Sequence, residues 1–353
     1  MVRILIAASG TGGHLFPALA VAEQLKTCEV EWLGVAHRLD RALVPQSYNF
    51  HTVPVEGFQG GVRLKTLKVI WDLITSVFKV KSLLKKRRID LVFTTGGYIA
   101  GPAILGARWQ GIPVILHESN YIPGKVTRWL SPLCQTTALG FQGTQTYLPR
   151  SRTLWVSTPV RQQFLTPQTL ALQIPPHMPL IVVVGGSQGA VALNQLVRQC
   201  IHSWVEAGSF IIHLSGRQDP DANSLEHSQY LVLPFYEDMA GLLQRADLAI
   251  SRAGAGTLTE LAVSATPAIL VPYPFAAEDH QTYNAQAFVK AGAAKLYAQT
   301  DLTVPKLKTE VLSLLRSPEQ LQEMKQKMSD LAVLDSAERL AELIKQQTKP
   351  SED

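Results

Sequence analysis

Cysteine is scarce in this chain of 353 residues, which has three cysteines that lie far apart and form no Cys-x-x-Cys pair. A sparse and odd set is typical of a reducing compartment, and it argues against a disulfide framework or a cysteine zinc site. Long hydrophobic runs are also lacking, so no segment is expected to span a bilayer. The apolar run at residues 4–8 is too short for a signal peptide and predicts a first buried strand instead.

Charged residues make up only 17% of the chain, whereas hydrophobic residues make up 46%. This balance argues against a largely disordered protein. The length suits two domains of roughly 150–200 residues each. The net charge of +5 favours anionic partners, namely nucleotides, phospholipid surfaces or nucleic acid, without choosing among them.

Short β-branched runs alternate with amphipathic segments of helical length. Strands are predicted at 4–8, 91–94, 114–117, 180–184, 210–214, 248–251 and 268–271, and helices at 15–25, 190–203 and 336–347. This alternation is typical of βαβ units, in which helices cover both faces of a parallel sheet.

The two halves of the chain repeat one pattern. Each opens with a strand, a glycine turn and a helix, in RILIAASGTGGHLFPALAVAEQL (3–25) and PLIVVVGGSQGAVALNQLV (179–197), and each carries a second glycine turn later. We therefore predict an α/β protein with two Rossmann-like, doubly wound parallel-sheet domains, 1–160 and 161–353. The segment 149–179 reads as the connection between them, and the helix at 336–347 is a candidate to pack back on the first domain.

The glycine turns, at 10–13, 96–98, 185–189 and 253–256, each follow a predicted strand and precede a helix. Open parallel sheets bind ligands beyond the carboxyl ends of their strands. Free N–H groups at a helix start favour an anion, and glycine lets the backbone approach a phosphate. Two such sets predict a central cleft for phosphorylated ligands. The dinucleotide fingerprint lacks its third glycine and no P-loop motif occurs, which argues against NAD and P-loop nucleotides.

Three further patterns suggest other chemistry but have simpler explanations. GGSQG (185–189) fits the nucleophile elbow of a serine hydrolase, but that fold has one sheet and no duplicated half. AspProAsp (219–221) resembles a metal–diphosphate motif, but its polar surroundings predict a solvated turn. HisGluSerAsn (117–120) begins like a zinc motif, but Tyr121 stands where the second histidine would be.

Together these motifs resemble the MurG family, the peptidoglycan glycosyltransferases of GT-B architecture that convert lipid I to lipid II. The matching segments cover nearly the whole chain: GTGGHLFPALAVAE (10–23), TGGYIAGP (95–102), GIPVILHESN (111–120), PVR (159–161), VVVGGSQGA (182–190), FYEDM (235–239), RAGAGTLTELA (252–262) and DHQTYNA (279–285). The chain departs from the usual pattern at Ser9, where glycine is usual, at Ser119, where glutamine is common, and at Ser157 and Thr158, where Gly-Asn is usual. These side chains keep hydrogen-bonding ability, so activity is expected to survive.

The resemblance implies that the second domain binds UDP-N-acetylglucosamine. The implied donor-site residues are Thr11, Gly12, Gly13, Asn120, Arg161, Ser187, Tyr236, Ala255, Gly256, Thr257, Glu260 and Gln281. The N–H groups at 255–257 and Ser187 would meet the diphosphate, the Tyr236 loop the uracil, Gln281 and Asn120 the sugar hydroxyls, and Arg161 would be a charge partner between the domains. Glu260 would accept hydrogen bonds from the ribose hydroxyls, or else only compensate a helix dipole.

The acceptor implied for the first domain is a polyprenyl-diphosphate-linked muramyl-pentapeptide, held by Thr11, Gly12, Gly13, Gly96, Gly97 and Tyr98. His14 would remove the proton from the acceptor C4 hydroxyl, and attack on an α-linked UDP-sugar would give a β linkage. Alternatively, its imidazole only hydrogen-bonds the phosphate. Helix starts and Arg161 would stabilise the departing UDP, so no cofactor and no obligatory metal are expected.

An apolar stripe, formed by Leu67, Trp71, Ile74 and Phe78, has the spacing of one helix face and is flanked by lysines and arginines, including the run 85–88. This composition is typical of an interfacial helix on anionic lipid, although a core-packed helix with solvated lysines is the other interpretation. We expect a peripheral protein on the cytoplasmic face of the cell membrane, with no nucleic-acid partner.

Other functions fit the same architecture. A diacylglycerol glycosyltransferase would also use a UDP-sugar at a membrane, whereas a UDP-N-acetylglucosamine 2-epimerase would need neither a lipid acceptor nor the apolar stripe. A non-catalytic UDP-sugar-binding regulator is a further alternative. Radiolabelled UDP-N-acetylglucosamine, offered with lipid I or with diacylglycerol, would separate them.

Overall fold

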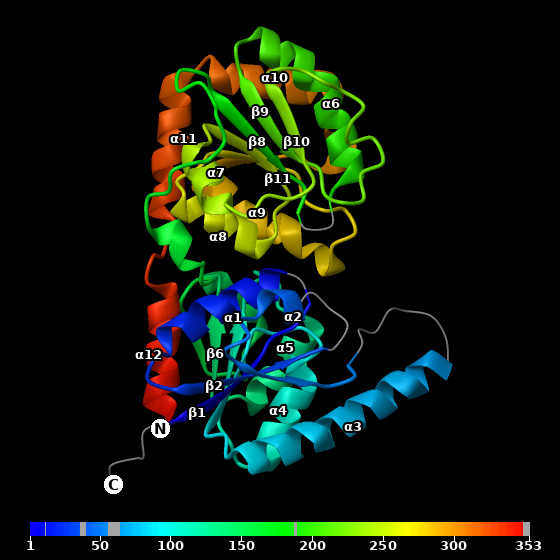
Figure 1. The fold of residues 1–353 in the computed structure, drawn as a ribbon, viewed down its shortest axis with the longest axis vertical. Coiled ribbons are helices and arrows are strands. Elements are labelled where there is room, and N and C mark those ends of the chain that lie inside the picture. Colours follow the sequence, from blue (N-terminus) through cyan, green and yellow to red (C-terminus); the bar gives the residue numbers. More distant parts are fainter. Residues whose placement is uncertain (11, 36–39, 56–63, 187–188, 349–353) are drawn as a thin grey trace. The chain divides into compact units, whose positions relative to one another are not determined.

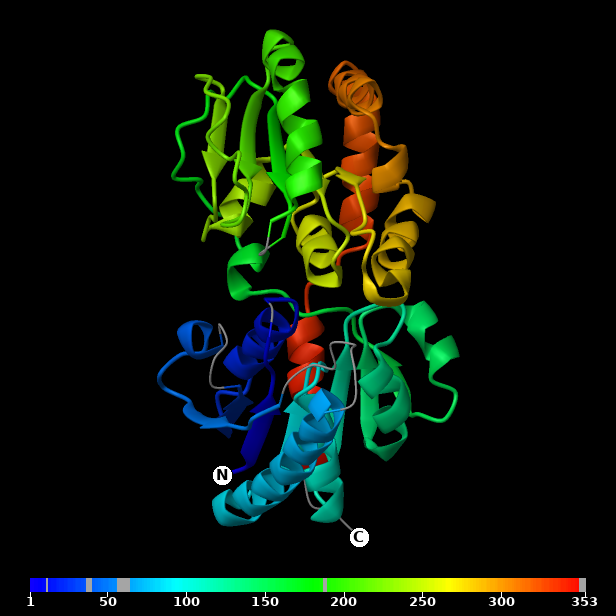
Figure 2. The same cartoon turned by 90° about the vertical axis from the view of Figure 1, so that its right-hand side faces the viewer.

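The computed structural model describes residues 1–10, 12–35, 40–55, 64–186 and 189–348. The chain divides into a first unit, Met1–Arg161 with Asp335–Asp353, and a second unit, Gln162–Leu334. Each unit has one parallel sheet with helices on both faces, which confirms the predicted fold class (Figures 1 and 2). In the described parts of the chain, every helix is too short or too polar to cross a membrane.

The first unit is built on a seven-stranded parallel sheet in the order β3-β2-β1-β4-β5-β6-β7. Its strands are β1 (Arg3–Ala7), β2 (Glu29–Gly34), β3 (Asn49–Thr52), β4 (Leu91–Thr94), β5 (Val114–Glu118), β6 (Thr136–Leu139) and β7 (Thr153–Trp155). Its α-helices are α1 (Gly12–Gln24), α2 (Asp40–Leu43), α3 (Leu64–Arg87), α4 (Ala100–Trp109), α5 (Lys125–Leu130) and α12 (Ser336–Thr348), with 3-10 turns η1 (Ser131–Leu133) and η2 (Gln142–Tyr147).

The second unit is built on a six-stranded parallel sheet in the order β10-β9-β8-β11-β12-β13. Its strands are β8 (Leu180–Val184), β9 (Phe210–Leu214), β10 (Tyr230–Leu233), β11 (Leu248–Ser251), β12 (Ala268–Leu270) and β13 (Ala294–Leu296). Its α-helices are α6 (Val191–Glu206), α7 (Met239–Arg245), α8 (Ala255–Val263), α9 (His280–Lys290), α10 (Val304–Leu315) and α11 (Pro318–Asp330), with 3-10 turns η3 (Gln162–Leu165), η4 (Ala277–Asp279) and η5 (Gln299–Asp301).

Strand β1 shows why the strands of these sheets are uniformly apolar. Successive side chains of a strand point to opposite faces of the sheet. Ile4 and Ile6 pack in a cluster with α1 and α12, whereas Leu5 and Ala7 pack in a second cluster with α3 and α4. All four side chains are fully buried. Because both faces of the sheet are covered, a continuous apolar run is required instead of an alternating one.

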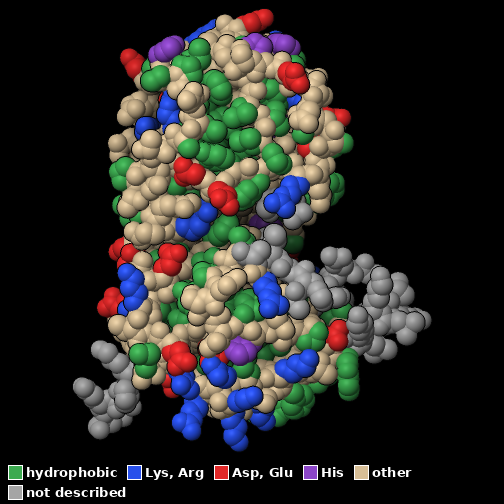
Figure 3. Space-filling model, in the orientation of Figure 1, with side chains coloured by type: hydrophobic (Ala, Val, Ile, Leu, Met, Phe, Trp, Pro, Cys, Tyr) green, Lys and Arg blue, Asp and Glu red, His purple; other side chains and the backbone are tan. Residues whose placement is uncertain are grey.

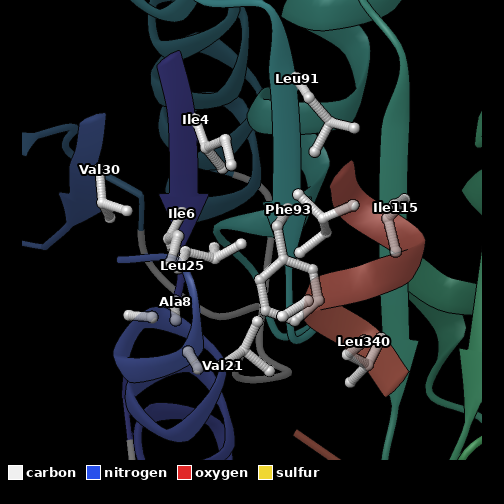
Figure 4. Packing of buried hydrophobic residues seen from close by; sticks show 14 of the residues in the cluster. Ile4, Ile6, Ala8, Val21, Leu25, Val30, Leu91, Phe93, Ile115 and Leu340 are labelled. Atoms are coloured by element: carbon white, nitrogen blue, oxygen red, sulfur yellow. The ribbon is translucent and has the colours of Figure 1, made fainter. Parts of the chain in front are cut away.

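The last helix, α12, belongs to the core of the first unit. Leu340, Ala341 and Ile344 are buried in the same cluster as Phe93 of β4. Figure 4 shows Leu340 close to Phe93. The Lys345 ammonium group also donates a hydrogen bond to the carbonyl at the end of α1, at 3.3 Å. These contacts attach the end of the chain to elements near its beginning.

The predicted connection at 149–179 contains a strand. β7 pairs in parallel with β6 and forms an edge of the first sheet, and the boundary between the units falls later, after Arg161. Arg161 is therefore the last residue of this part of the first unit and does not open the second. β7 was not predicted because it has three residues and its Leu154 and Trp155 are exposed, so the apolar run of a buried strand is missing.

Candidate active site

The strand order of each sheet reverses at the two strands that precede its glycine turns. In the first unit β1 and β4 are neighbours, and in the second unit β8 and β11 are neighbours. Open parallel sheets bind ligands beyond the carboxyl ends of the strands at such a switch point. The topology therefore brings two glycine turns together in each unit, at the edge where a ligand is expected.

His14 links the two glycine turns of the first unit. Its Nδ1 lies 2.7 Å from the carbonyl oxygen of Thr95, and the Thr95 hydroxyl donates to the His14 carbonyl at 2.9 Å. A carbonyl oxygen only accepts, so Nδ1 carries the proton of the first bond. In the neutral ring, Nε2 then has a free lone pair and is a hydrogen-bond or proton acceptor.

A cavity of about 180 Å³ lies beside His14. Its lining residues are Ser9, Gly10, His14, Val35, Val55, Gly97, Tyr98 and Ile99. Gly96 and Gly97 have φ values of +87° and +73°, in the left-handed region that favours glycine. A Cβ atom on Gly97 would lie 3.5 Å from His14 Nε2, so its absence leaves room beside this nitrogen.

Two of the six predicted acceptor residues line this cavity. Gly97 and Tyr98 line it, and Gly12 and Gly13 form the first turn of α1, whose N–H groups have no partner within the helix. Thr11 lies outside the described residues. The first unit therefore combines Nε2 of His14, which accepts a hydrogen bond when the ring is neutral, with N–H donors at the start of α1.

Glu118 organises the loop that carries Asn120. Its buried carboxylate accepts hydrogen bonds from the N–H groups of Asn120 and Gly124 at 3.0 and 3.1 Å. It also accepts from the Asn120 amide at 3.3 Å and from the Thr127 hydroxyl at 2.6 Å. Two of these four bonds hold Asn120, one at its backbone N–H and one at its side-chain amide. This role of Glu118 was not predicted from the sequence, where the residue was only part of an incomplete zinc motif. The available signal was a carboxylate at the end of a buried strand.

His117 connects the end of β5 to the segment after β7. Burial lowers its pKa to about 4, so the ring is neutral at pH 7 and its Nε2–H donates to the Ser157 carbonyl at 2.9 Å. Ser157 has a φ of +67°, a conformation that costs a residue with a Cβ more than it costs glycine. This cost is a physical reason why the MurG family usually has glycine at the position of Ser157.

In the second unit, the predicted donor residues share the start of α8. Gly254 is the N-cap, and Ala255, Gly256 and Thr257 form the first turn. Glu260 follows Gly256 by four residues, so both lie on the same side of the helix. Ser187, from the neighbouring glycine turn, lies outside the described residues.

Gln281 of α9 is hydrogen-bonded to the glycine turn that precedes α8. Its Oε1 accepts from the N–H groups of Ala253 and Tyr273 at 3.2 and 2.9 Å. Asn284 of the same helix donates to the Ala253 carbonyl at 3.2 Å. Since its carbonyl oxygen is held by these bonds, the NH₂ group is the part of the Gln281 side chain that suits an oxygen acceptor such as a sugar hydroxyl.

The AspProAsp loop was predicted to be a solvated turn, and this is wrong for Asp219. Asp219 is 9% exposed and forms an ion pair with Arg198 at 2.7 Å, while Asn194 donates to it at 2.6 Å. Burial alone would raise the pKa of Asp219, but the hydrogen bonds from Arg198 and Asn194 outweigh it and lower the pKa. Both partners lie on α6, more than twenty residues earlier, so local composition does not reveal them. The Asp221 side chain is 50% exposed.

Two other predicted residues have defined surroundings within their own units. The Arg161 guanidinium lies 4.3 Å from the centre of the Phe16 ring on α1, which places it against the helix that begins at the acceptor turn. Tyr236 is partly buried, and burial together with the nearby Asp238 raises its pKa.

The apolar stripe is exposed where the structure describes it. Trp71, Ile74 and Phe78 are 64%, 44% and 52% exposed, so the interpretation as a core-packed face is wrong for these three. The side chain of Leu67 lies outside the described residues. The Phe78 ring lies 5.3 Å from that of Trp109 of α4. Figure 3 shows lysine and arginine side chains gathered on the first unit near the end of α3, where residues 85–88 lie.

Two parallel-sheet units, each with paired glycine turns at its switch point, have the GT-B architecture, which is the fold of many nucleotide-sugar-dependent glycosyltransferases. The chain belongs to glycosyltransferase family 28. The N-terminal domain of this family matches residues 4–139, and its C-terminal domain matches residues 180–345.

Individual relatives agree with this assignment. A protein of Gloeothece citriformis, named UDP-N-acetylglucosamine--N-acetylmuramyl-(pentapeptide) pyrophosphoryl-undecaprenol N-acetylglucosamine transferase, is 65% identical over 98% of this chain and 96% of its own. The crystal structure of Acinetobacter baumannii MurG is 32% identical over 98% of this chain and 100% of that one, with a TM-score of 0.80. A putative UDP-N-acetylglucosamine 2-epimerase of Listeria monocytogenes is 14% identical over 98% and 96%, with a TM-score of 0.71. The last likeness concerns the fold alone, so the fold does not separate a transferase from an epimerase.

Proposed function

We propose that this protein transfers N-acetylglucosamine from UDP-N-acetylglucosamine to the C4 hydroxyl of the muramyl residue of lipid I, giving lipid II. The name of the Gloeothece citriformis relative, at 65% identity over nearly the whole chain, supports this substrate pair. The observation that carries the mechanism is the hydrogen bond between His14 Nδ1 and the Thr95 carbonyl.

In the proposed reaction, His14 acts as the general base. Its Nε2 takes the proton of the acceptor C4 hydroxyl while the hydroxyl oxygen attacks the anomeric carbon of the donor sugar. The new glycosidic bond forms as the bond from the anomeric carbon to the diphosphate breaks, which inverts the α linkage to β. The Thr95 carbonyl, 2.7 Å from Nδ1, stabilises the imidazolium that results.

The same hydrogen bond argues against the alternative in which His14 only binds a phosphate and takes no proton. Because Nδ1–H already donates to Thr95, Nε2 could donate to a phosphate only if the ring carried a second proton. In the neutral ring, the Nε2 lone pair would face the anion instead. The geometry therefore favours the base over the phosphate-ligand role.

The second unit would bind the donor at the start of α8. The N–H groups of Gly256 and Thr257 would hold the diphosphate and stabilise it as it leaves, since a helix start favours negative charge. Glu260 would accept from the ribose hydroxyls, and the NH₂ group of Gln281 would donate to a sugar hydroxyl.

We infer that the reaction needs no obligatory metal. Asp219 belongs to the AspProAsp sequence that resembles a metal–diphosphate motif. Its carboxylate forms an ion pair with Arg198 and accepts a hydrogen bond from Asn194. A carboxylate held in this way is poorly suited to bridge a metal ion and a diphosphate. Transfer that persists in excess EDTA is the expected result.

We also infer that the protein attaches peripherally to anionic lipid on the cytoplasmic face of the membrane. Trp71, Ile74 and Phe78 offer exposed apolar area next to basic residues, which suits the boundary between headgroups and acyl chains. Trp109 extends this surface onto α4, and the Lys81 ammonium lies 4.0 Å from the centre of its ring.

One incubation tests the proposed function. The protein is mixed with radiolabelled UDP-N-acetylglucosamine and either a short-chain lipid I analogue or diacylglycerol, and the lipids are extracted. Label in the lipid I arm alone is the expected result. Label in the diacylglycerol arm, or formation of UDP-N-acetylmannosamine without any lipid product, would replace the proposal with one of the two alternative enzymes.

A further inference from the structure

The hydroxyl of Ser9 is a buried polar group beside the His14 cavity. Ser9 follows β1, lines the cavity and is 8% exposed. Its Oγ has no hydrogen-bond partner within the part of the chain that the structure describes. A buried hydroxyl that has lost its water without gaining a partner destabilises the fold, so such a group needs an explanation.

The neighbouring polar groups are satisfied. The Thr94 hydroxyl donates to the Ala7 carbonyl at 2.7 Å, and the Trp32 indole donates to the Ala8 carbonyl at 3.1 Å. The Thr95 hydroxyl donates to the His14 carbonyl. Of these four side chains, only Ser9 lines the cavity, and only Ser9 lacks a partner among the described residues. This indicates that the partner of its hydroxyl is a ligand.

The chemistry of the cavity points to an anion held by neutral donors. Among the residues that the structure describes, none of those lining it is Lys, Arg, Asp or Glu. The start of α1 follows the lining residues Ser9 and Gly10 in the chain, and its N–H groups favour negative charge. A hydroxyl that donates to a phosphoryl oxygen forms a charge-assisted hydrogen bond, which is stronger than one to a neutral acceptor.

We propose that Ser9 is a further ligand-binding residue of this enzyme, whose Oγ–H donates to an oxygen of the diphosphate in the lipid-linked acceptor. The assignment rests on the proposed function. It adds to the N–H array a side-chain donor at a position where the resembling family usually has glycine. A diphosphate also occurs in the nucleotide donor, so the experiment must separate the two sources.

The decisive variant is Ser9→Ala, compared with Ser76→Ala. Ser76 of α3 is also in the first unit, fully buried and without a hydrogen-bond partner among the described residues, but it does not line the cavity. Steady-state rates are measured with a short-chain lipid I analogue and with UDP-N-acetylglucosamine, each varied at saturation of the other. Ser9→Ala is expected to raise the KM for the lipid I analogue about tenfold or more, because a hydrogen bond to a charged group contributes at least that factor.

The other readouts distinguish a ligand contact from a structural role. The KM for UDP-N-acetylglucosamine and the Tm should stay close to wild type, and Ser76→Ala should change neither KM. Inorganic pyrophosphate, used as an inhibitor competing with the lipid I analogue, should bind Ser9→Ala more weakly by the same factor. If Ser9→Ala does not fold, Ser9→Gly removes the same hydroxyl and is measured instead.

Each contrary outcome has one meaning. An unchanged KM for the lipid I analogue in a folded variant overturns the assignment, and a rise confined to the KM for UDP-N-acetylglucosamine moves the hydroxyl to the donor diphosphate and also overturns it. Failure of the wild-type protein to label the lipid I analogue contradicts the proposed function itself. Pyrophosphate binding, measured by calorimetry on wild type and Ser9→Ala, tests the hydroxyl without any turnover.

Discussion

Asp219→Asn is expected to destabilise the second unit by about 3–5 kcal/mol, since removing one partner of a buried ion pair leaves the other charge uncompensated. The geometry explains why an isosteric amide does not substitute. One carboxylate oxygen accepts from Asn194 and Arg198 at 2.6 and 2.7 Å, and the other accepts from Arg198 and the Asp221 N–H at 3.3 and 3.1 Å. Whichever way the amide of Asn is placed, its NH₂ group meets two donors.

The measurement is differential scanning calorimetry of Asp219→Asn beside Asp221→Asn. Asp221 lies 3.8 Å from the same Arg198 but is half exposed, and an exposed pair contributes about 0–1 kcal/mol. A loss of about 3–5 kcal/mol corresponds to a fall in Tm of about 6–20 °C for a domain of this size. Equal and small losses in the two variants would refute the view that the Asp219 pair is buried and indispensable.

The pH dependence supplies a second check with a defined sign. The pKa of Asp219 is lowered in the folded protein, so its contribution is fully present above the ordinary aspartate pKa of about 4 and is lost as the pH falls through the lowered value. The difference in stability between wild type and Asp219→Asn should therefore stay constant from pH 8 to about 5 and shrink below about pH 4. A difference that grows as the pH falls would contradict the assigned direction of the shift.

Replacing His14 with Ala should lower kcat by about 100-fold or more with little change in the acceptor KM, because a general base contributes about 10²–10⁴-fold. Steady-state assays check this. A near-normal kcat with a raised acceptor KM would instead make His14 a phosphate ligand. Replacing Trp71 and Phe78 together with Ser should reduce co-sedimentation with anionic vesicles about tenfold or more, through the loss of buried apolar area. The control Trp129→Ser removes an aromatic that is 74% exposed outside the stripe, and an equal loss there would argue against a specific lipid-facing surface. Ser157→Gly should raise the Tm by about 1–3 °C in a thermal melt. The free energy gained by removing the left-handed strain of a residue with a Cβ should exceed the cost of the extra entropy that glycine gives the unfolded chain. A lower Tm would show that the serine side chain stabilises the segment.

The sequence predicted best where one physical requirement determines the residues. Seven predicted strands agree with the observed strands to within one residue at each end, because strands buried on both faces must be apolar along their length. The glycine turns were predictable for a similar reason, since Gly96 and Gly97 adopt φ values that other residues avoid. Short strands with exposed or polar residues, such as β7 and β13, carry no such requirement and gave no signal.

The contacts that depend on folding across long sequence distances were not predictable. Asp219 is buried only because α6 places Arg198 and Asn194 beside its loop. The partners of Glu118 are local, but the N–H groups two and six residues later reach its carboxylate only because of the conformation of the loop, which the residue types do not reveal. The residue types Asp219 and Glu118 were noted in the sequence, but only the structure identifies their hydrogen-bond partners and therefore their roles.

The position of α12 has a consequence for how the protein is made. The chain leaves the first unit after Arg161, builds the whole second unit, and returns at Asp335 to insert Leu340 and Ile344 into the first core. During synthesis, which proceeds from the N-terminus, part of the apolar core of the first unit therefore stays uncovered while residues 162–334, about half of the chain, are added. The second unit, which is one continuous segment, has all of its residues available earlier, so the unit that is encoded first is the last to be completed.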